Sequence, residues 1–437
     1  MIALEFLVVL SAILIGARLG GIGLGVMGGL GLAVLTFGFG LKPTTAPIDV
    51  MLMIVAVITA AACLQVASGM DWLVRQAEHL LRRNPRQITW YAPLVTYGFT
   101  LCAGTGHVAY AVLPVIAEVS REAGVRPERP LSIAVIASQA AITASPISAA
   151  TVALLSLLAG DGVQLFDILM VAIPATLCGV MAGAAVASRL GPELDADPVY
   201  QARLAAGEVA PPHRTDVPES PAHARHAVAI FLLAAGAVVL LGSFPALRPS
   251  WQLAGQTQTL DMASAIEMVM LSAAALILLV CRVPAEQVVK GSVFRAGAAA
   301  VIGIFGVAWM GDTFIQANMA FFSGEIRATV TAAPWLFAVA LFVMSILLYS
   351  QAATIRALMP LGIALGLPAP ALIAMFPAVN GYFFIPNYPT VIAAINFDAT
   401  GSTRIGRWLL NHSFMLPGLT CSVVSVGAGF ALAQLLL

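Results

Sequence analysis

Ten apolar runs limit the folds open to this chain, because each is long enough, or nearly so, to cross a lipid bilayer as a helix. They cover residues 3–17, 22–40, 48–68, 131–158, 166–188, 226–243, 263–281, 296–310, 369–395 and 413–435. Of the 437 residues, 60% are hydrophobic and 10% are charged, whereas about 25% of the residues in soluble domains are charged. The sequence therefore predicts an all-α integral membrane protein with ten transmembrane helices.

Two longer apolar stretches, 89–120 and 333–366, do not fit this pattern. Each is too long for one helix and is interrupted in its middle, the first at "AGTGH" (103–107) and the second at "YSQAA" (349–353). Non-helical backbone at membrane depth is tolerated where protein or a water-filled cavity surrounds it. We therefore interpret each stretch as a re-entrant hairpin whose tip lies inside the membrane.

The two halves of the chain, 1–188 and 226–437, repeat the same order of spans, hairpin and prolines. Each half holds five spans, and an odd number of crossings turns the second half upside down relative to the first. Such inverted repeats are typical of secondary transporters. The corresponding segments are 104–120 with 350–366, which pairs Pro114 with Pro360, and 138–153 with 381–396, which pairs Pro146 with Pro389.

The linker between the halves, residues 189–225, is polar, contains prolines and has no apolar helical stripe. We expect a solvated and partly disordered loop. With the N-terminus outside, most of the 21 Lys and Arg residues fall on the same side as this linker. The positive-inside rule then places the linker in the cytoplasm and both termini outside.

Four places have the sequence of a helix that starts inside the membrane: Thr105-Gly106, Ser145-Pro146, Ser350-Gln351 and Asn387-Tyr388 before Pro389. Ser, Thr and Asn are preferred helix caps, and proline is favoured in the first turn. Helix starts present free N–H groups and a partial positive charge, so they attract anions. The inverted repeat would gather all four near the membrane centre.

Arg356 adds a full positive charge about one turn from the second hairpin tip. A lone guanidinium in an apolar segment costs free energy unless something compensates it. We therefore predict a binding site for a small dianion. The candidate binding residues are Thr105, Gly106, His107, Ser145, Pro146, Ser148, Gln351, Thr354, Arg356, Asn387, Tyr388, Pro389 and Thr390.

Several alternatives stay open at this point. The proline breaks also fit ordinary helix kinks, and Arg356 also fits a side chain that extends to the membrane interface. His107 is compatible with a hydrogen-bonded tip residue, a proton carrier or a ligand. Asp71 and Asp312, one in each half, would suit an intramembrane hydrolase, but we interpret them as helix caps.

Other residues and motifs narrow the class. Asp398 is interpreted as a loop acid that pairs with Arg404 or Arg407. The sequence holds no G-x-x-x-x-G-K-[ST] loop and no H-E-x-x-H motif, so we expect neither direct ATP hydrolysis nor a zinc protease. We expect no cofactor, no bound metal and no nucleic-acid partner.

A set of motifs in order, which includes "AGTGH", "LPVIAEV", "ITASPISAA", "LLYSQAAT", "TGSTRIG" and "NHSF", resembles the anaerobic C4-dicarboxylate transporter (Dcu) family, DcuA/DcuB-like. The likeness runs along nearly the whole chain, except 190–224 and 244–262. It implies exchange of fumarate, malate, aspartate and succinate across the bacterial inner membrane during anaerobic growth, and no enzyme activity. Family members have Lys or Arg where Arg356 stands and often Asn where His107 stands. A membrane sensor kinase is kept as an alternative protein partner.

The hairpins and broken helices are also similar to those of sodium-coupled dicarboxylate transporters. That resemblance implies a homodimer and an elevator motion, in which the hairpins and broken helices move against a scaffold of early spans. The tips here lack the asparagine that helps to hold Na⁺ in those proteins. We therefore expect exchange without Na⁺, with a Na⁺- or H⁺-coupled dicarboxylate symporter as the alternative.

Overall fold

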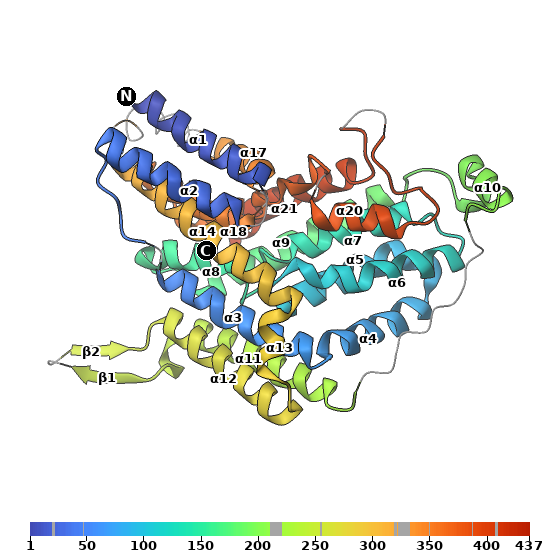
Figure 1. Cartoon of the computed structure of the whole chain (residues 1–437), viewed down its shortest axis with the longest axis horizontal. Coiled ribbons are helices and arrows are strands. Elements are labelled where there is room, and N and C mark those ends of the chain that lie inside the picture. The colour runs from blue at the N-terminus through green and yellow to red at the C-terminus, as the bar shows by residue number, and fades with distance from the viewer. Residues whose placement is uncertain are drawn as a thin grey trace.

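The computed structural model describes residues 1–19, 22–46, 48–209, 221–253, 256–318, 321, 333–348, 350–386, 388–406 and 410–437. Within these residues the chain is predominantly helical (Figure 1). The predicted helical class is therefore confirmed.

The first half opens with apolar helices and one sharp bend. Its first four helices are α1 (Ile2–Leu19), α2 (Gly23–Ala33), α3 (Ile48–Val66) and α4 (Gly69–Arg83). α2 continues into one π-helical turn at Val34–Gly38. α3 and α4 meet at an angle of 70°. Ser68 sits at this bend with a φ of 57°, in the left-handed region.

The stretch 89–120 forms two helices, α5 (Ile88–Ala103) and α6 (Ala109–Glu122), as the sequence predicts. The run 131–158 is also broken, into α7 (Glu128–Ala140) and α8 (Ala149–Leu158), with turns between them. α9 (Leu165–Ala187) then completes the first half as a continuous helix.

The second half of the chain contains further helices and one pair of strands. Its elements are α11 (Ala224–Ser243), β1 (Ser250–Leu253), β2 (Gln256–Thr259), α12 (Met262–Cys281), α13 (Ala285–Lys290), α14 (Ser292–Ala317), α17 (Trp335–Leu348), α18 (Gln351–Ala364), α19 (Ala369–Met375), α20 (Pro389–Phe397) and α21 (Met415–Leu436). α17 and α18 correspond to the second predicted hairpin. Two 3₁₀ turns, Phe376–Val379 and Gly381–Phe383, separate α19 from α20.

The β-ribbon is one departure from an all-α chain. β1 and β2 pair antiparallel, with Ser250 opposite Thr259, between the predicted spans 226–243 and 263–281. The ribbon projects from one end of the molecule, and the linker helix α10 (Pro198–Ala205) lies at the opposite end (Figure 1).

Among the described residues, five helices are long and apolar enough to cross a membrane unaided, or six if the bent pair α3–α4 counts as one span. The five are Leu165–Ala187, Ala224–Gly242, Met262–Cys281, Val293–Ala317 and Met415–Leu436. Other apolar segments are shorter because they are broken or end early, as in α8 and α17. The predicted count of ten spans therefore stays a prediction.

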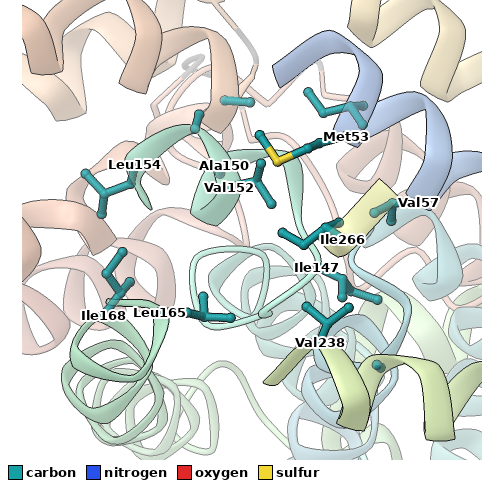
Figure 2. Packing of buried hydrophobic residues seen from close by; sticks show 14 of the residues in the cluster. Met53, Val57, Ile147, Ala150, Val152, Leu154, Leu165, Ile168, Val238 and Ile266 are labelled. Carbon is teal, nitrogen blue, oxygen red and sulfur yellow. The ribbon is translucent and has the colours of Figure 1, made fainter. Parts of the chain in front are cut away.

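The largest core joins helices from both halves. Side chains from α3, α8, α9, α11 and α12 meet there, and Figure 2 shows Met53, Val152, Leu165, Val238 and Ile266 among them. α14 packs against α2 and α3, and α18 packs against α14 and α8. The second hairpin therefore lies between a broken helix of the first half and a long span of the second.

The expectation of a solvated linker is wrong for its first part. Leu194, Tyr200 and Val209 form a small buried cluster of their own. Asp197 forms a buried ion pair with Arg126 in the turn between α6 and α7. Arg203 Nη1 donates to the carbonyl oxygen of Thr400 at 3.0 Å. Residues 210–220 of the linker lie outside the described residues.

Among the described residues, Asp398 does not form the predicted pair with Arg404. Its side chain is buried, and its carboxylate accepts hydrogen bonds from the Thr400 N–H at 2.9 Å, the Ser402 hydroxyl at 2.7 Å and the Thr403 N–H at 2.6 Å. It thus stabilises its own loop and forms no salt bridge with Arg404 in the described structure. Arg407 lies outside the described residues.

Candidate functional site

The tips of the two hairpins are built by local sequence signals. Gly104 ends α5 in the left-handed conformation, with a φ of 69°, which glycine adopts without steric cost. Thr105 and the 3₁₀ turn Gly106–Val108 follow. At the second tip, the Ser350 hydroxyl caps α18 by accepting from the Ala353 N–H at 3.2 Å. The predicted helix start at Ser350 is confirmed.

A cluster of three buried amide side chains joins these tips to the broken helices. Gln351 Nε2 donates to Gln139 Oε1 and to Asn380 Oδ1, both at 3.2 Å. Gln139, at the end of α7, is 1% exposed, and Asn380, between the two 3₁₀ turns, is 6% exposed. Gly106 packs on the same group, because a Cβ there would lie 2.2 Å from Gln139 Nε2. We call Gln139, Gln351 and Asn380 the amide cluster.

Two members of the amide cluster were missed by the sequence reasoning. Gln139 and Asn380 end the first halves of the two broken helices, whereas the predicted site residues lie at the starts of the second halves. The sequence does mark both residues, because each is an amide in an otherwise apolar segment. Gln139 lies in "IASQAA" and Asn380 lies in "PAVNGY". Buried amides need hydrogen-bond partners, so each pointed to a polar neighbour.

The first broken helix starts later than predicted. Its cap is Ser148, whose hydroxyl accepts from the Thr151 N–H at 3.1 Å, and α8 begins at Ala149. Ser145 and Pro146 lie in the turns before it, where the Ser145 hydroxyl donates to the Leu101 carbonyl of α5 at 2.7 Å. Ser145 therefore ties the broken helix to the first hairpin.

The second broken helix starts where the sequence predicts. Tyr388 is its cap residue, and Pro389 occupies the first position of α20. Thr390 is 1% exposed, and its hydroxyl has no hydrogen-bond partner among the described residues. Asn387 and the side chain of His107 lie outside the part of the chain that the structure describes.

Arg356 lies inside the protein, with 5% of its surface exposed. Its Nη2 donates to the Ser156 hydroxyl of α8 at 3.4 Å. Its own helix is braced by Thr354, whose hydroxyl donates to the Ser350 carbonyl at 2.8 Å. The guanidinium is thus enclosed by protein groups. The depth of Arg356 in the membrane stays a prediction.

Asp312 is an electrostatic partner of Arg356 on the neighbouring helix α14. α14 and α18 are in close contact here, since a Cβ on Gly311 would lie 3.7 Å from the Cα of Ala357. α14 runs unbroken through this position, so the interpretation of Asp312 as a helix cap is wrong. Asp71 lies exposed in the first turn of α4, whose N-cap residue is Ser68. The interpretation of Asp71 as a helix cap stays a prediction.

Comparisons with known proteins find relatives along the whole chain. The family model described as an anaerobic C4-dicarboxylate membrane transporter, DcuA/DcuB, matches residues 1–437. The C4-dicarboxylate transporter DcuA of Wolinella succinogenes is 46% identical over 437 residues, which cover 100% of both chains. DcuA of Escherichia coli K12 is 44% identical over 438 residues, again with 100% of both chains covered.

A more distant relative and a solved structure extend the likeness. The anaerobic C4-dicarboxylate transporter DcuB of Escherichia coli O6:H1 is 38% identical, with 99% of this chain and 98% of that protein covered. The crystal structure of the YdaH transporter of Alcanivorax borkumensis, described as having an unusual topology, superposes with a TM-score of 0.57 at 16% identity. It covers 96% of this chain and 98% of that one, and shows that the fold is one used by a transporter. With its apolar helices and full-length matches, this multi-pass membrane protein is a transporter and not an enzyme, and it belongs to the DcuA/DcuB family of anaerobic C4-dicarboxylate membrane transporters.

Proposed function

We propose that this protein exchanges C4-dicarboxylates, such as fumarate, malate, aspartate and succinate, across the bacterial inner membrane by alternating access. The observation that carries the proposal is the buried guanidinium of Arg356 on a helix whose start meets the amide cluster. A fixed cation and free helix-start N–H groups together suit the two negative charges of such a substrate.

The substrate would bind at the start of α18. One carboxylate would replace the long Ser156 contact of Arg356 with a shorter charge-assisted pair. Gln351 precedes Arg356 by five residues, which is about 7.5 Å along a helix axis. The second carboxylate would therefore meet the first turn of α18 and the amide cluster, and it would displace the bond between Gln351 and Gln139.

The rest of the predicted site would support these contacts. The residues assigned to substrate binding or to its first support are Thr105, Gly106, His107, Ser145, Pro146, Ser148, Gln351, Thr354, Arg356, Asn387, Tyr388, Pro389 and Thr390. Ser145 and Ser148 would act indirectly, because their hydroxyls already bond to backbone groups.

The transport motion would be an elevator movement in a homodimer. α5 to α8 and α17 to α20 would form the moving block, and the earlier helices of each half would form the scaffold. Both termini would lie on the periplasmic side and the linker in the cytoplasm. The support for this topology is that the β-ribbon and the linker helix lie at opposite ends of the molecule (Figure 1). In the predicted arrangement of spans, moreover, most Lys and Arg residues fall on the same side as the linker.

Exchange in purified protein tests the proposal. Proteoliposomes preloaded with succinate should take up labelled fumarate or aspartate equally well with and without Na⁺, and empty ones much more slowly. A steep dependence on external Na⁺ with no effect of internal succinate would replace exchange by cation-coupled symport. Absence of saturable dicarboxylate uptake under all conditions would refute dicarboxylate transport itself.

A further inference from the structure

A second candidate site, with two charged side chains in its lining, lies beside the base of the β-ribbon, apart from the amide cluster. It is a cavity of about 440 Å³, within the size range of small-molecule sites. Its walls come from α3, α8, the start of α9, the end of α11 and the start of α12. Met53, Val152 and Leu165 of the core in Figure 2 form part of its apolar lining.

The cavity reaches toward the buried arginine. Ser156 lines it, and the same hydroxyl accepts the hydrogen bond from Arg356 Nη2 at 3.4 Å. A single serine therefore stands between the cavity and the guanidinium to which we assign the substrate carboxylate. A ligand in this cavity would therefore lie next to the proposed substrate site.

Two opposite charges line the cavity without forming a salt bridge with each other in the described structure. Arg248 is half-buried and is held in place by its Nη1, which donates to the Leu260 carbonyl at 3.1 Å. Arg248 therefore presents a fixed positive charge to the cavity. A guanidinium attracts a carboxylate, to which it can donate two parallel hydrogen bonds.

Asp261 supplies the negative charge. Its Oδ1 accepts from the Ser264 N–H at 2.9 Å and so caps α12. A carboxylate has about four acceptor positions, so this cap leaves acceptor capacity on the exposed side chain. Asp261 would repel a plain dicarboxylate but would attract an ammonium group. The cavity thus pairs a carboxylate-binding group with an ammonium-binding group.

We propose that this cavity is an outer vestibule that first binds α-amino dicarboxylates such as aspartate, with Arg248 on a carboxylate and Asp261 on the ammonium group. The inference rests on the proposed dicarboxylate transport and adds a preference within that substrate class. Arg248 would serve every dicarboxylate, whereas Asp261 would distinguish aspartate from succinate and fumarate.

The test compares the KM for aspartate and for succinate in right-side-out and inside-out membrane vesicles. Arg248→Gln should raise both KM values about five- to tenfold for transport from the face of the β-ribbon, because a charge that guides the substrate is lost. Arg248→Lys should retain most of the wild-type affinity. Lys42→Gln removes an exposed cation that does not line this cavity and should change neither KM.

Asp261→Asn is the decisive variant, because asparagine is an equally good helix cap and keeps α12 intact. It should raise the KM for aspartate about fivefold and leave or lower the KM for succinate. An unchanged ratio of the two KM values in Asp261→Asn, or unchanged values in Arg248→Gln, would overturn the vestibule. Failure of the wild-type protein to exchange any C4-dicarboxylate would instead refute the proposed function.

Discussion

Arg356 of α18 reaches Ser156 of α8, with 3.4 Å between the guanidinium Nη2 and the serine hydroxyl. The contact joins the second hairpin to the first broken helix, 200 residues apart in the sequence. It is long for a hydrogen bond to a charged group. We infer that a substrate carboxylate would replace the serine with a shorter, charge-assisted contact.

The first prediction separates the charge of Arg356 from its contact with Ser156. Arg356→Ala should weaken dicarboxylate binding about ten- to a hundredfold, because hydrogen bonds to charged groups contribute about 1.5–3 kcal/mol. Arg356→Lys should keep partial exchange as a point charge. Ser156→Ala, the control, keeps the charge and should change the KM less than about threefold. Unchanged exchange in Arg356→Ala would show that the guanidinium does not bind substrate.

The second prediction concerns the close packing of α2 on α14 within the proposed scaffold. A Cβ on Gly28 would lie 2.5 Å from the Gly306 carbonyl carbon, whereas a Cβ on the adjacent Gly29 would meet nothing within 4 Å. Gly28→Ala should destabilise the protein by about 1–3 kcal/mol through overpacking. Gly29→Ala should be neutral or stabilising by up to about 1 kcal/mol from helix propensity. Thermal unfolding in detergent measures both, and equal effects of the two variants would contradict close packing.

The third prediction concerns pH and the loop before α21. The Phe414 N–H donates to His412 Nδ1 at 3.2 Å, and His412 Nε2 lies 3.3 Å from the Phe384 carbonyl oxygen. Burial lowers the pKa of His412, and the Phe384 carbonyl opposes this only in part. Protonation of Nδ1 would also break the bond from Phe414.

The unfolded chain should therefore take up the His412 proton first as the pH falls below about 6.5. The contribution of His412 to stability is complete above that pH and is lost as the pH falls through the lower, folded-state pKa. Thermal unfolding from pH 8 to pH 5 should show a smaller decline in His412→Gln than in the wild type. His79→Gln, at an exposed position of α4, is the control and should follow the wild-type curve.

The breaks in the helices were predictable because each depends on its own local sequence. Gly104 supplies a left-handed turn, Ser350 supplies a cap, and Pro389 supplies a first-turn residue without an N–H. These preferences act over a few residues and are read directly from the chain. The start of α8 was misplaced because Ser145 and Ser148 are both possible caps, and the contact of Ser145 with Leu101 decides between them.

The amide cluster and the linker were not predictable in the same way. The bond between Gln351 and Gln139 joins residues 212 positions apart, and the pair Arg126–Asp197 depends on where α10 folds back. Such partners follow from the packing of whole helices, which no local pattern specifies. Polar residues in apolar segments show that a partner exists but do not identify it.

The last prediction concerns Asp312, which we infer balances Arg356 when no substrate is bound. Asp312 lies on α14 of the proposed scaffold and Arg356 on α18 of the proposed moving block. Their attraction would hold the empty carrier in place, and a substrate carboxylate would compete with Asp312 for the guanidinium. The bound substrate would thereby release the block, so that the loaded carrier crosses faster than the empty one.

Asp312→Asn should weaken this restraint while it preserves the size and shape of the side chain. We expect uptake into empty proteoliposomes to rise relative to uptake into succinate-loaded ones, with saturable binding retained. The matched control is Asp71→Asn, at an exposed position in the first turn of α4, which should leave that ratio unchanged. If Asp312→Asn abolishes binding, Asp312 instead orients Arg356 for substrate. If the ratio of the two rates stays at the wild-type value, a restraint other than this charge pair sets the requirement for exchange.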